Sequence, residues 1–138
     1  MEKLVIDTSI LVKLFVKEEG REEVKKLVGW ALRGEIELIC PDFLVIELIN
    51  VLLLVKKLDK KRVGVLVSSL LAKGIEVVPY SYSNWPELVD LMDKYDLTAY
   101  DAVYLWLARE EKCKLLTADC KLLRVKDRCV GLDEISNV

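Results

Sequence analysis

Short apolar segments that alternate with helical patterns constrain the fold of this chain more than any other feature. The predicted strands cover residues 3–7, 36–40, 75–78, 114–117 and, as a short fifth strand, 129–132. Each strand is apolar along most of its length, and a helical pattern follows each of the first four. This arrangement is typical of a parallel sheet that helices cover on both faces. The sequence therefore predicts an α/β fold with a parallel sheet of four to five strands.

Periodicity and capping residues predict the helices. The first helix would be capped by Thr8 or Ser9 and would end at Gly20, and residues 56–62 would form a basic, exposed connection. The other predicted helices cover residues 21–32, 43–55, 63–71, 84–95, 98–111 and 119–123. The chain shows no linker, internal repeat or low-complexity segment, so we expect one domain over residues 1–138.

Composition places the chain among globular proteins. It has 138 residues, of which 53% are hydrophobic and 32% are charged, a balance that excludes a disordered chain. The longest nearly apolar stretch, residues 43–55, is shorter than the roughly 20 residues that a membrane-spanning helix needs. The N-terminus carries no cleavable signal pattern. We therefore expect a cytoplasmic protein without a membrane-embedded segment.

Net charge and cysteine content limit the partners. A net charge of −2 argues against a protein that coats nucleic acid, although an enzyme with a local basic patch stays compatible with it. The chain has no histidine and no C-x-x-C pair, which disfavours a structural zinc site. Buried free thiols are expected, and a disulfide is left open, at Cys40, Cys113, Cys120 and Cys129.

Four acidic residues stand where apolar structure should continue. Asp7 ends the first strand, Glu47 lies inside an apolar helix, Asp101 is in the first turn of another, and Asp119 follows the fourth strand. The functional crevice of an open α/β sheet lies at the carboxyl ends of its strands, so we expect the four acids at one edge. Because the chain lacks histidine, the cation that suits this oxygen-rich set is Mg²⁺ or Mn²⁺.

Each acid also has a structural explanation when it is taken alone. A helix dipole favours an acid at a helix start, and Glu47 shares a helix face with Asn50, where both could bond a buried basic or backbone group. The four acids together are more specific than any one. Ionised carboxylates in one crevice repel each other, and cation binding removes that penalty. The simplest chemistry is hydrolysis of a phosphodiester by a metal-activated water.

Polar and basic side chains are expected around these acids. Residues that can orient a carboxylate, a water or a phosphate are Thr8, Asn50 and Thr117, whereas helix capping is favoured for Ser9. Cations expected to contact phosphate groups are Lys13, Lys17, Lys121 and Arg124. The basic residues between 56 and 62 are expected to face solvent away from the acids.

Four segments of the chain resemble the motifs of PIN-domain nucleases, most closely the VapC-type toxins of toxin–antitoxin pairs. The segments are residues 5–9, 47–52, 97–105 and 115–119, in the order and spacing of that family. The resemblance covers nearly the whole chain and implies a three-layer α/β/α, Rossmann-like fold with Mg²⁺- or Mn²⁺-dependent endoribonuclease activity. The catalytic and metal-binding positions that it implies are Asp7, Glu47, Asp101 and Asp119, with Thr117 as a supporting polar residue.

The resemblance also implies partners. Members of this family usually form homodimers, which the apolar helices of this chain independently predict, and the toxins are inhibited by a small antitoxin protein, VapB-like in this case. Two positions depart from the family pattern. Cys120 stands where a basic residue often follows the last acid, so Lys121 or Arg124 would contact phosphate instead. Trp106 stands where a small residue is common, and we expect it to pack in the core or a dimer interface.

Other functions stay open on the sequence alone. A housekeeping PIN nuclease of RNA processing would carry the same residues. A catalytically silent PIN module that serves as a binding partner would be expected to lack one or more acids, and all four are present. A receiver-like domain that accepts a phosphoryl group on an acid would need an aspartate at the end of the third strand, where this chain has Pro79.

Overall fold

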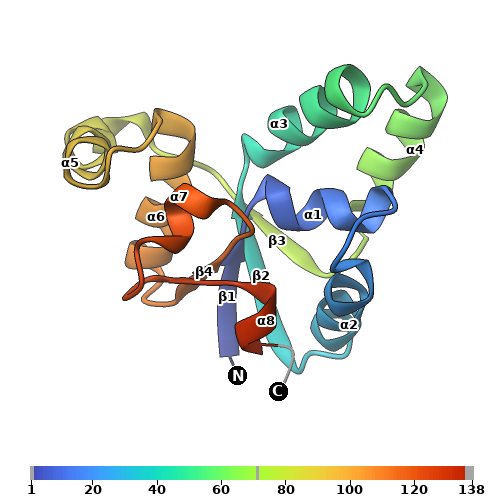
Figure 1. Cartoon of the computed structure of the whole chain (residues 1–138), viewed down its shortest axis with the longest axis horizontal. Coiled ribbons are helices and arrows are strands. Elements are labelled where there is room, and N and C mark those ends of the chain that lie inside the picture. The colour runs from blue at the N-terminus through green and yellow to red at the C-terminus, as the bar shows by residue number, and fades with distance from the viewer. Residues whose placement is uncertain (1, 71, 136–138) are drawn as a thin grey trace.

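A five-stranded parallel sheet forms the centre of the molecule. The computed structural model describes residues 2–70 and 72–135, and the strand order is β3-β2-β1-β4-β5 (Figure 1). The strands are β1 (Glu2–Ile6), β2 (Ile36–Pro41), β3 (Ile75–Val78), β4 (Lys114–Leu116) and β5 (Cys129–Val130). In the register of the central strand, Val5 pairs with Ile39 of β2 and with Leu115 of β4. The predicted parallel sheet is confirmed.

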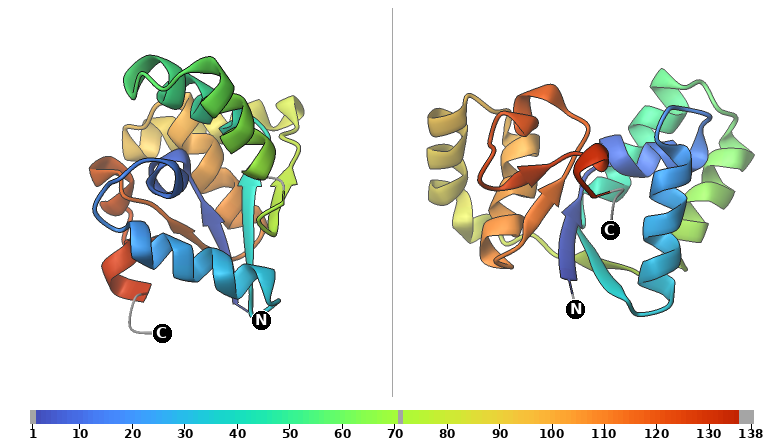
Figure 2. Two further views of the ribbon diagram at one scale, coloured as in Figure 1. Left: turned by 90° about the vertical axis from the view of Figure 1, so that its right-hand side faces the viewer. Right: turned by 60° about the horizontal axis from the view of Figure 1, so that its bottom comes forward.

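Helices cover both faces of this sheet. One side carries α1 (Thr8–Phe15), α2 (Arg21–Leu32), α3 (Leu44–Asn50) and α4 (Lys60–Leu70). The other carries α5 (Trp85–Tyr95) and α6 (Ala99–Glu110), and Figures 1 and 2 show the two groups of helices on opposite sides of the strands. The short helices α7 (Cys120–Leu123) and α8 (Leu132–Ile135) accompany the last two strands. The three-layer α/β/α architecture is therefore confirmed.

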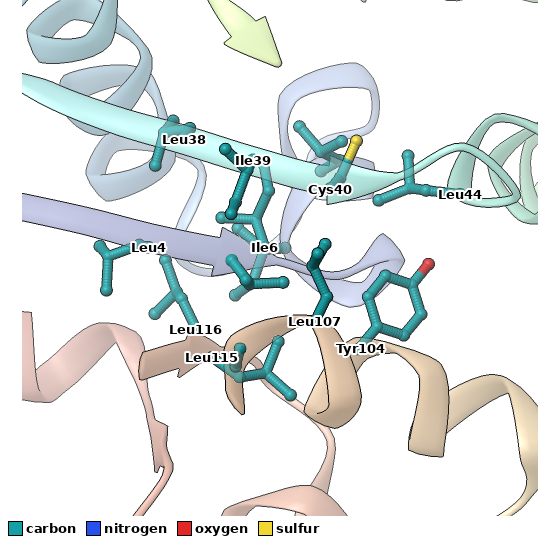
Figure 3. Packing of buried hydrophobic residues seen from close by; sticks show 14 of the residues in the cluster. Leu4, Ile6, Leu38, Ile39, Cys40, Leu44, Tyr104, Leu107, Leu115 and Leu116 are labelled. Carbon is teal, nitrogen blue, oxygen red and sulfur yellow. The ribbon is translucent and has the colours of Figure 1, made fainter. Parts of the chain in front are cut away.

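The apolar core lies on both sides of the central strands. Leu4, Ile6, Leu38 and Leu115 are almost fully buried, and Figure 3 shows Leu115 beside Leu107 of α6, with Leu4 and Leu38 further back along β1 and β2. Burial on both faces explains why the strands read as nearly continuous apolar runs. The chain winds from β1 to β3 in one direction and continues through β4 and β5 in the other. The order therefore reverses between β1 and β4, which is where a ligand crevice is expected in such a sheet.

The helix predicted over residues 43–55 is not one continuous α-helix. The α-helix ends at Asn50, and a π-helical turn, η1 (Val51–Val55), continues it. The basic connection predicted for residues 56–62 is also wrong in part, because α4 begins at Lys60. The carboxylate of Asp59 accepts a hydrogen bond from the amide of Arg62 at 2.9 Å and so supports that helix start.

Other element ends also differ from the sequence prediction. The first helix ends at Phe15 instead of continuing to Gly20, which has φ 91° and precedes α2. A short 3₁₀ turn, η2 (Tyr82–Asn84), precedes α5, and α8 was not predicted. The predicted helix over residues 63–71 ends on Leu71, which lies outside the described residues.

Candidate active site

The four predicted acids meet at the point where the strand order reverses. Asp7 directly follows β1, and Asp119 comes three residues after the end of β4. Asp101 lies in the first turn of α6. Glu47 lies in the first turn of α3, whereas the sequence predicted the second turn. The charges of Asp119 and Glu47 both raise the pKa of Asp101. The charge of Asp101 in turn raises the pKa of Asp7. Four separate segments thus contribute mutually repelling carboxylates to one edge.

Asp7 is buried and is held by three donors. Its Oδ1 atom accepts hydrogen bonds from the Ser9 hydroxyl at 2.5 Å and from the amide of Ile10 at 3.3 Å. Its Oδ2 atom accepts one from the Thr117 hydroxyl. Burial raises the pKa of Asp7 to about 6, against the lowering effect of these hydrogen bonds. The carboxyl group therefore keeps its proton to a higher pH than an ordinary aspartate does. The same residue is the N-cap of α1.

The cap of α1 corrects two sequence expectations. Asp7, and neither Thr8 nor Ser9, accepts the hydrogen bond from the first turn of the helix. The Ser9 hydroxyl instead accepts from the amide of Ala118 at 2.9 Å while it donates to Asp7. Ser9 consequently ties the start of α1 to the segment after β4, a role that helix capping did not predict.

Glu47 is held by two hydroxyl groups from other elements. Its Oε1 atom accepts hydrogen bonds from Thr8 at 3.0 Å and from Tyr104. Tyr104 is buried in α6, and burial together with the hydrogen bond to Glu47 raises its pKa above the ordinary value. Sequence reasoning missed Tyr104 because it lies inside an apolar helix. Its position three residues after Asp101, on the same helix face, was the available signal.

Asp101 and Asp119 lie at helix starts and make local contacts. The Oδ1 atom of Asp119 caps α7 by accepting from the amides of Lys121 at 2.8 Å and Leu122 at 3.2 Å. The predicted cap of α6 is confirmed, because Thr98 accepts a hydrogen bond from the amide of Asp101 at 3.2 Å. Partial burial is the largest cause that raises the pKa of Asp101, ahead of the neighbouring acids.

Thr117 connects two of the acids. Its side chain is fully buried, and its hydroxyl donates to Asp7 while it accepts from the amide of Asp119 at 3.0 Å. The predicted supporting residue Asn50 is the exposed last residue of α3 and lines a pocket of about 490 Å³ together with Glu47. Aromatic side chains form much of that pocket, among them Tyr82, Trp85 and Tyr100.

The predicted phosphate-binding cations differ in their contacts. Lys121 is exposed, and its charge lowers the pKa of Asp101, which places it beside the acidic edge. Arg124 is exposed, and its Nε atom donates to the carbonyl of Lys121 at 3.5 Å. The Nζ atom of Lys13 donates to the carbonyl of Glu19 at 2.9 Å. Lys13 also lines a second pocket, of about 410 Å³, which Thr117 borders from the acidic edge. Lys17 is exposed.

The donor atoms of this edge suit a hard divalent cation. They are carboxylate and hydroxyl oxygens, and the mutual repulsion of the acids is the penalty that such a cation relieves. Within residues 2–70 and 72–135, no three acidic or cysteine side chains are placed closely enough to hold a metal ion as they stand. Cation binding would therefore require at least some of these carboxylates to turn toward the others.

The cysteines contribute no disulfide to the structure. All four are free thiols, with Cys40 and Cys129 buried, Cys113 partly buried and Cys120 exposed. Burial raises the pKa of both Cys40 and Cys129 to about 12, so these two are inert core residues. The expectation of a buried thiol is wrong for Cys120, which follows Asp119 on the surface.

The fold and the acidic edge define a three-layer α/β/α protein with its polar centre at a switch point of the sheet. The sequence model of the PIN domain matches residues 4–128, and the chain therefore belongs to the PIN-domain family. Membership of this family supports the assignment of the protein as a nuclease. No curated protein matches the chain significantly. Within the described part of the chain, no helix is both long enough and apolar enough to cross a membrane.

Solved structures share this fold at low sequence identity. PAE2754 from Pyrobaculum aerophilum superposes with a TM-score of 0.73 at 16% identity, over 99% of this chain and 93% of that chain. VapC20 from Mycobacterium tuberculosis, a sarcin–ricin loop cleaving toxin, gives 0.71 at 13% identity, over 88% and 94%. VapBC2 from Rickettsia felis, solved with a DNA fragment from the promoter, gives 0.70 at 15% identity, over 94% and 98%. The predicted PIN fold is thereby confirmed.

Proposed function

We propose that this protein is a Mg²⁺- or Mn²⁺-dependent endoribonuclease and the toxin of a VapBC-type toxin–antitoxin pair. One observation carries the proposal: four carboxylates from four segments converge at the switch point of a PIN-domain sheet, where the charges of Glu47 and Asp119 raise the pKa of Asp101 and the charge of Asp101 raises the pKa of Asp7. A single PIN domain over residues 1–138 is the corresponding domain assignment. Water and a phosphodiester are the reactants that such an edge suits.

The residues assigned to the cation are Asp7, Glu47, Asp101 and Asp119. When bound by these residues, a divalent cation would supply an activated water and charge stabilisation at the phosphate. The hydroxyls of Ser9 and Thr117 donate hydrogen bonds to the buried carboxylate of Asp7, and the hydroxyl of Thr8 donates one to Glu47. Asn50 lies further along α3, where the pocket that it shares with Glu47 offers space for substrate next to the acids.

Lys121 is the foremost candidate for a phosphate contact. Its charge already acts on Asp101, and Arg124 lies on the same short segment. Lys13 is the third candidate, although its amine is engaged with a backbone carbonyl. Substitution of Lys121 by Ala should weaken RNA binding without loss of fold. An unchanged RNA affinity of that variant would remove Lys121 from the site.

A second copy and a small antitoxin are the proposed protein partners. Large apolar side chains are exposed along α3, η1 and α5, among them Ile46, Leu54, Trp85 and Val89, and an exposed apolar surface of this kind is typical of an interface. Fold relatives solved as toxin–antitoxin complexes support an antitoxin partner. A light-scattering mass near 15.8 kDa at micromolar concentration would refute the homodimer.

The proposal is tested by cleavage of a mixed RNA pool with purified protein. The pool should contain transfer, messenger and ribosomal RNA, the last because one fold relative cleaves the sarcin–ricin loop. Cleavage should require Mg²⁺ or Mn²⁺, stop in EDTA, and be lost in Asp101→Asn and Asp119→Asn. Asp90→Asn, at an exposed acid of α5, is the matched control. Absence of cleavage and of Mn²⁺ binding would instead favour a silent binding module.

A further inference from the structure

A buried tyrosine of α6 reaches across to the carboxylate of α3. The Tyr104 side chain is only 1% exposed, and its hydroxyl donates to Oε1 of Glu47, 57 residues away in the sequence. Figure 3 shows the ring at the end of the apolar cluster, with its hydroxyl group directed away from Leu107. The ring also packs against Phe43 with a centroid separation of 5.1 Å. The ring therefore belongs to the core, whereas its hydroxyl belongs to the acidic edge.

Thr8 completes a triangle of oxygens with these two residues. Its hydroxyl donates to the same Oε1 atom of Glu47 at 3.0 Å and lies 3.0 Å from the Tyr104 hydroxyl. Among the described residues, both hydrogen bonds to this carboxylate end on Oε1 and none ends on Oε2. Two donors thus hold one oxygen atom, and no described residue donates a hydrogen bond to the second.

The position of Tyr104 on α6 gives this contact a second consequence. Asp101 lies three residues earlier on the same helix face, and the charge of Glu47 repels its carboxylate. Without a tie, Glu47 would be free to rotate away from Asp101 toward solvent. The Tyr104 hydroxyl therefore ties Glu47 to α6, the helix that also carries Asp101.

We propose that Tyr104 is a positioning residue that, together with Thr8, fixes the Glu47 carboxylate through one oxygen and keeps the other available to a divalent cation. This inference rests on the proposed function of the acidic edge. A hydroxyl that orients a metal-binding carboxylate contributes about 10- to 100-fold to metal affinity in other metal sites.

The test compares Tyr104→Phe with Tyr100→Phe. The first removes only the buried hydroxyl and keeps the ring against Phe43. The second removes an exposed hydroxyl of the same helix, whose ring lies 6.1 Å from Phe43. Calorimetric titration with Mn²⁺ should give about tenfold weaker binding for Tyr104→Phe and unchanged binding for Tyr100→Phe. Thr8→Val should weaken binding in the same direction.

RNA cleavage as a function of Mn²⁺ concentration supplies a second readout. Tyr104→Phe should need more Mn²⁺ for half-maximal cleavage and should approach the wild-type rate at saturation. Equal Mn²⁺ affinity of Tyr104→Phe, Tyr100→Phe and wild type, with only a lower melting temperature for Tyr104→Phe, would overturn the inference and leave the proposed function intact. A wild-type protein that neither binds Mn²⁺ nor cleaves RNA would overturn both.

Discussion

The two acids inside the site and the two acids at its rim are held by different means. The inner acids, Asp7 and Glu47, accept hydrogen bonds from the hydroxyls of Thr117 and Tyr104, which are 110 and 57 residues away in sequence. The rim acids, Asp101 and Asp119, make hydrogen bonds within three residues of their own positions. Contacts between distant segments therefore position the inner acids, whereas the starts of α6 and α7 position the rim acids.

The consequence of this difference concerns stability. A buried carboxylate costs free energy unless its partners compensate, so Asp7, the buried member of the inner pair, lowers the stability of the fold. The rim acids lie where the helix dipole favours them. Substitutions at the rim should thus change activity with little effect on stability, whereas substitutions around Asp7 should change both.

Asp101→Asn should lower the catalytic efficiency of RNA cleavage by roughly 100- to 1,000-fold, about 3–4 kcal/mol of transition-state stabilisation. The physical reason is the loss of one negative charge from the set that would hold the cation. The melting temperature should change little, because Asp101 is only partly buried and is repelled by its acidic neighbours. Kinetics and thermal unfolding of the same sample check both parts. Activity within threefold of wild type would exclude Asp101 from the site.

Asp7→Asn should change the pH dependence of stability. The pKa of Asp7 is about 6 in the folded protein and 3.8 ordinarily, so between these values the folded state binds more protons than the unfolded state. Wild type should consequently lose up to about 3 kcal/mol of unfolding free energy from this residue as the pH rises from about 4 to 7. Asparagine does not ionise, so the variant should lack this decrease.

The measurement for Asp7→Asn is urea unfolding of both proteins at several pH values in EDTA. The difference in unfolding free energy between variant and wild type should grow toward neutral pH and level off above pH 6 to 7. Asp90→Asn, at an exposed position of α5, should run parallel to wild type. A parallel course for Asp7→Asn as well would mean that Asp7 carries no burial penalty.

Thr117→Val should destabilise the protein by about 2 kcal/mol, because it leaves buried polar groups without a partner. The lost hydroxyl donates to Asp7 and accepts from the amide of Asp119, so this residue joins the inner pair to the rim pair. Thr117→Ser keeps the hydroxyl and should recover most of the loss. Chemical unfolding of the three proteins decides the matter: equal destabilisation by Val and Ser would assign the effect to packing alone.

The sequence predicted those parts of the molecule that depend on local patterns. The strands are apolar and end where acids or helix caps begin, so their ends were placed within two residues. The convergence of the acids followed from a rule of parallel sheets, namely that carboxyl ends of strands share an edge. Thr98 was recognised as a cap because an N-cap residue acts on its own helix.

Contacts between distant segments could not be predicted in the same way. The partner of the Tyr104 hydroxyl depends on the distance between α3 and α6, which periodicity does not determine. Ser9 was expected to cap a helix, but Asp7 takes that role and the hydroxyl turns toward Ala118. Asp59 was overlooked as a helix cap because it lies among basic residues, and nothing local marks the π-helical turn after Asn50.

The smallest predicted effect is at the rim, where Thr98→Ala removes the cap of α6. Its hydroxyl accepts one hydrogen bond, from the amide of Asp101, and loss of such a cap costs about 1 kcal/mol. The position of Asp101 depends on where α6 begins and not on a hydrogen-bond donor from a distant segment. The Mn²⁺ affinity of the variant should therefore stay within about twofold of the wild-type value. Thermal unfolding and calorimetric titration measure the two quantities. A large loss of Mn²⁺ affinity would show that rim acids, like the inner acids, depend on a specific hydroxyl, and the distinction between the pairs would then fail.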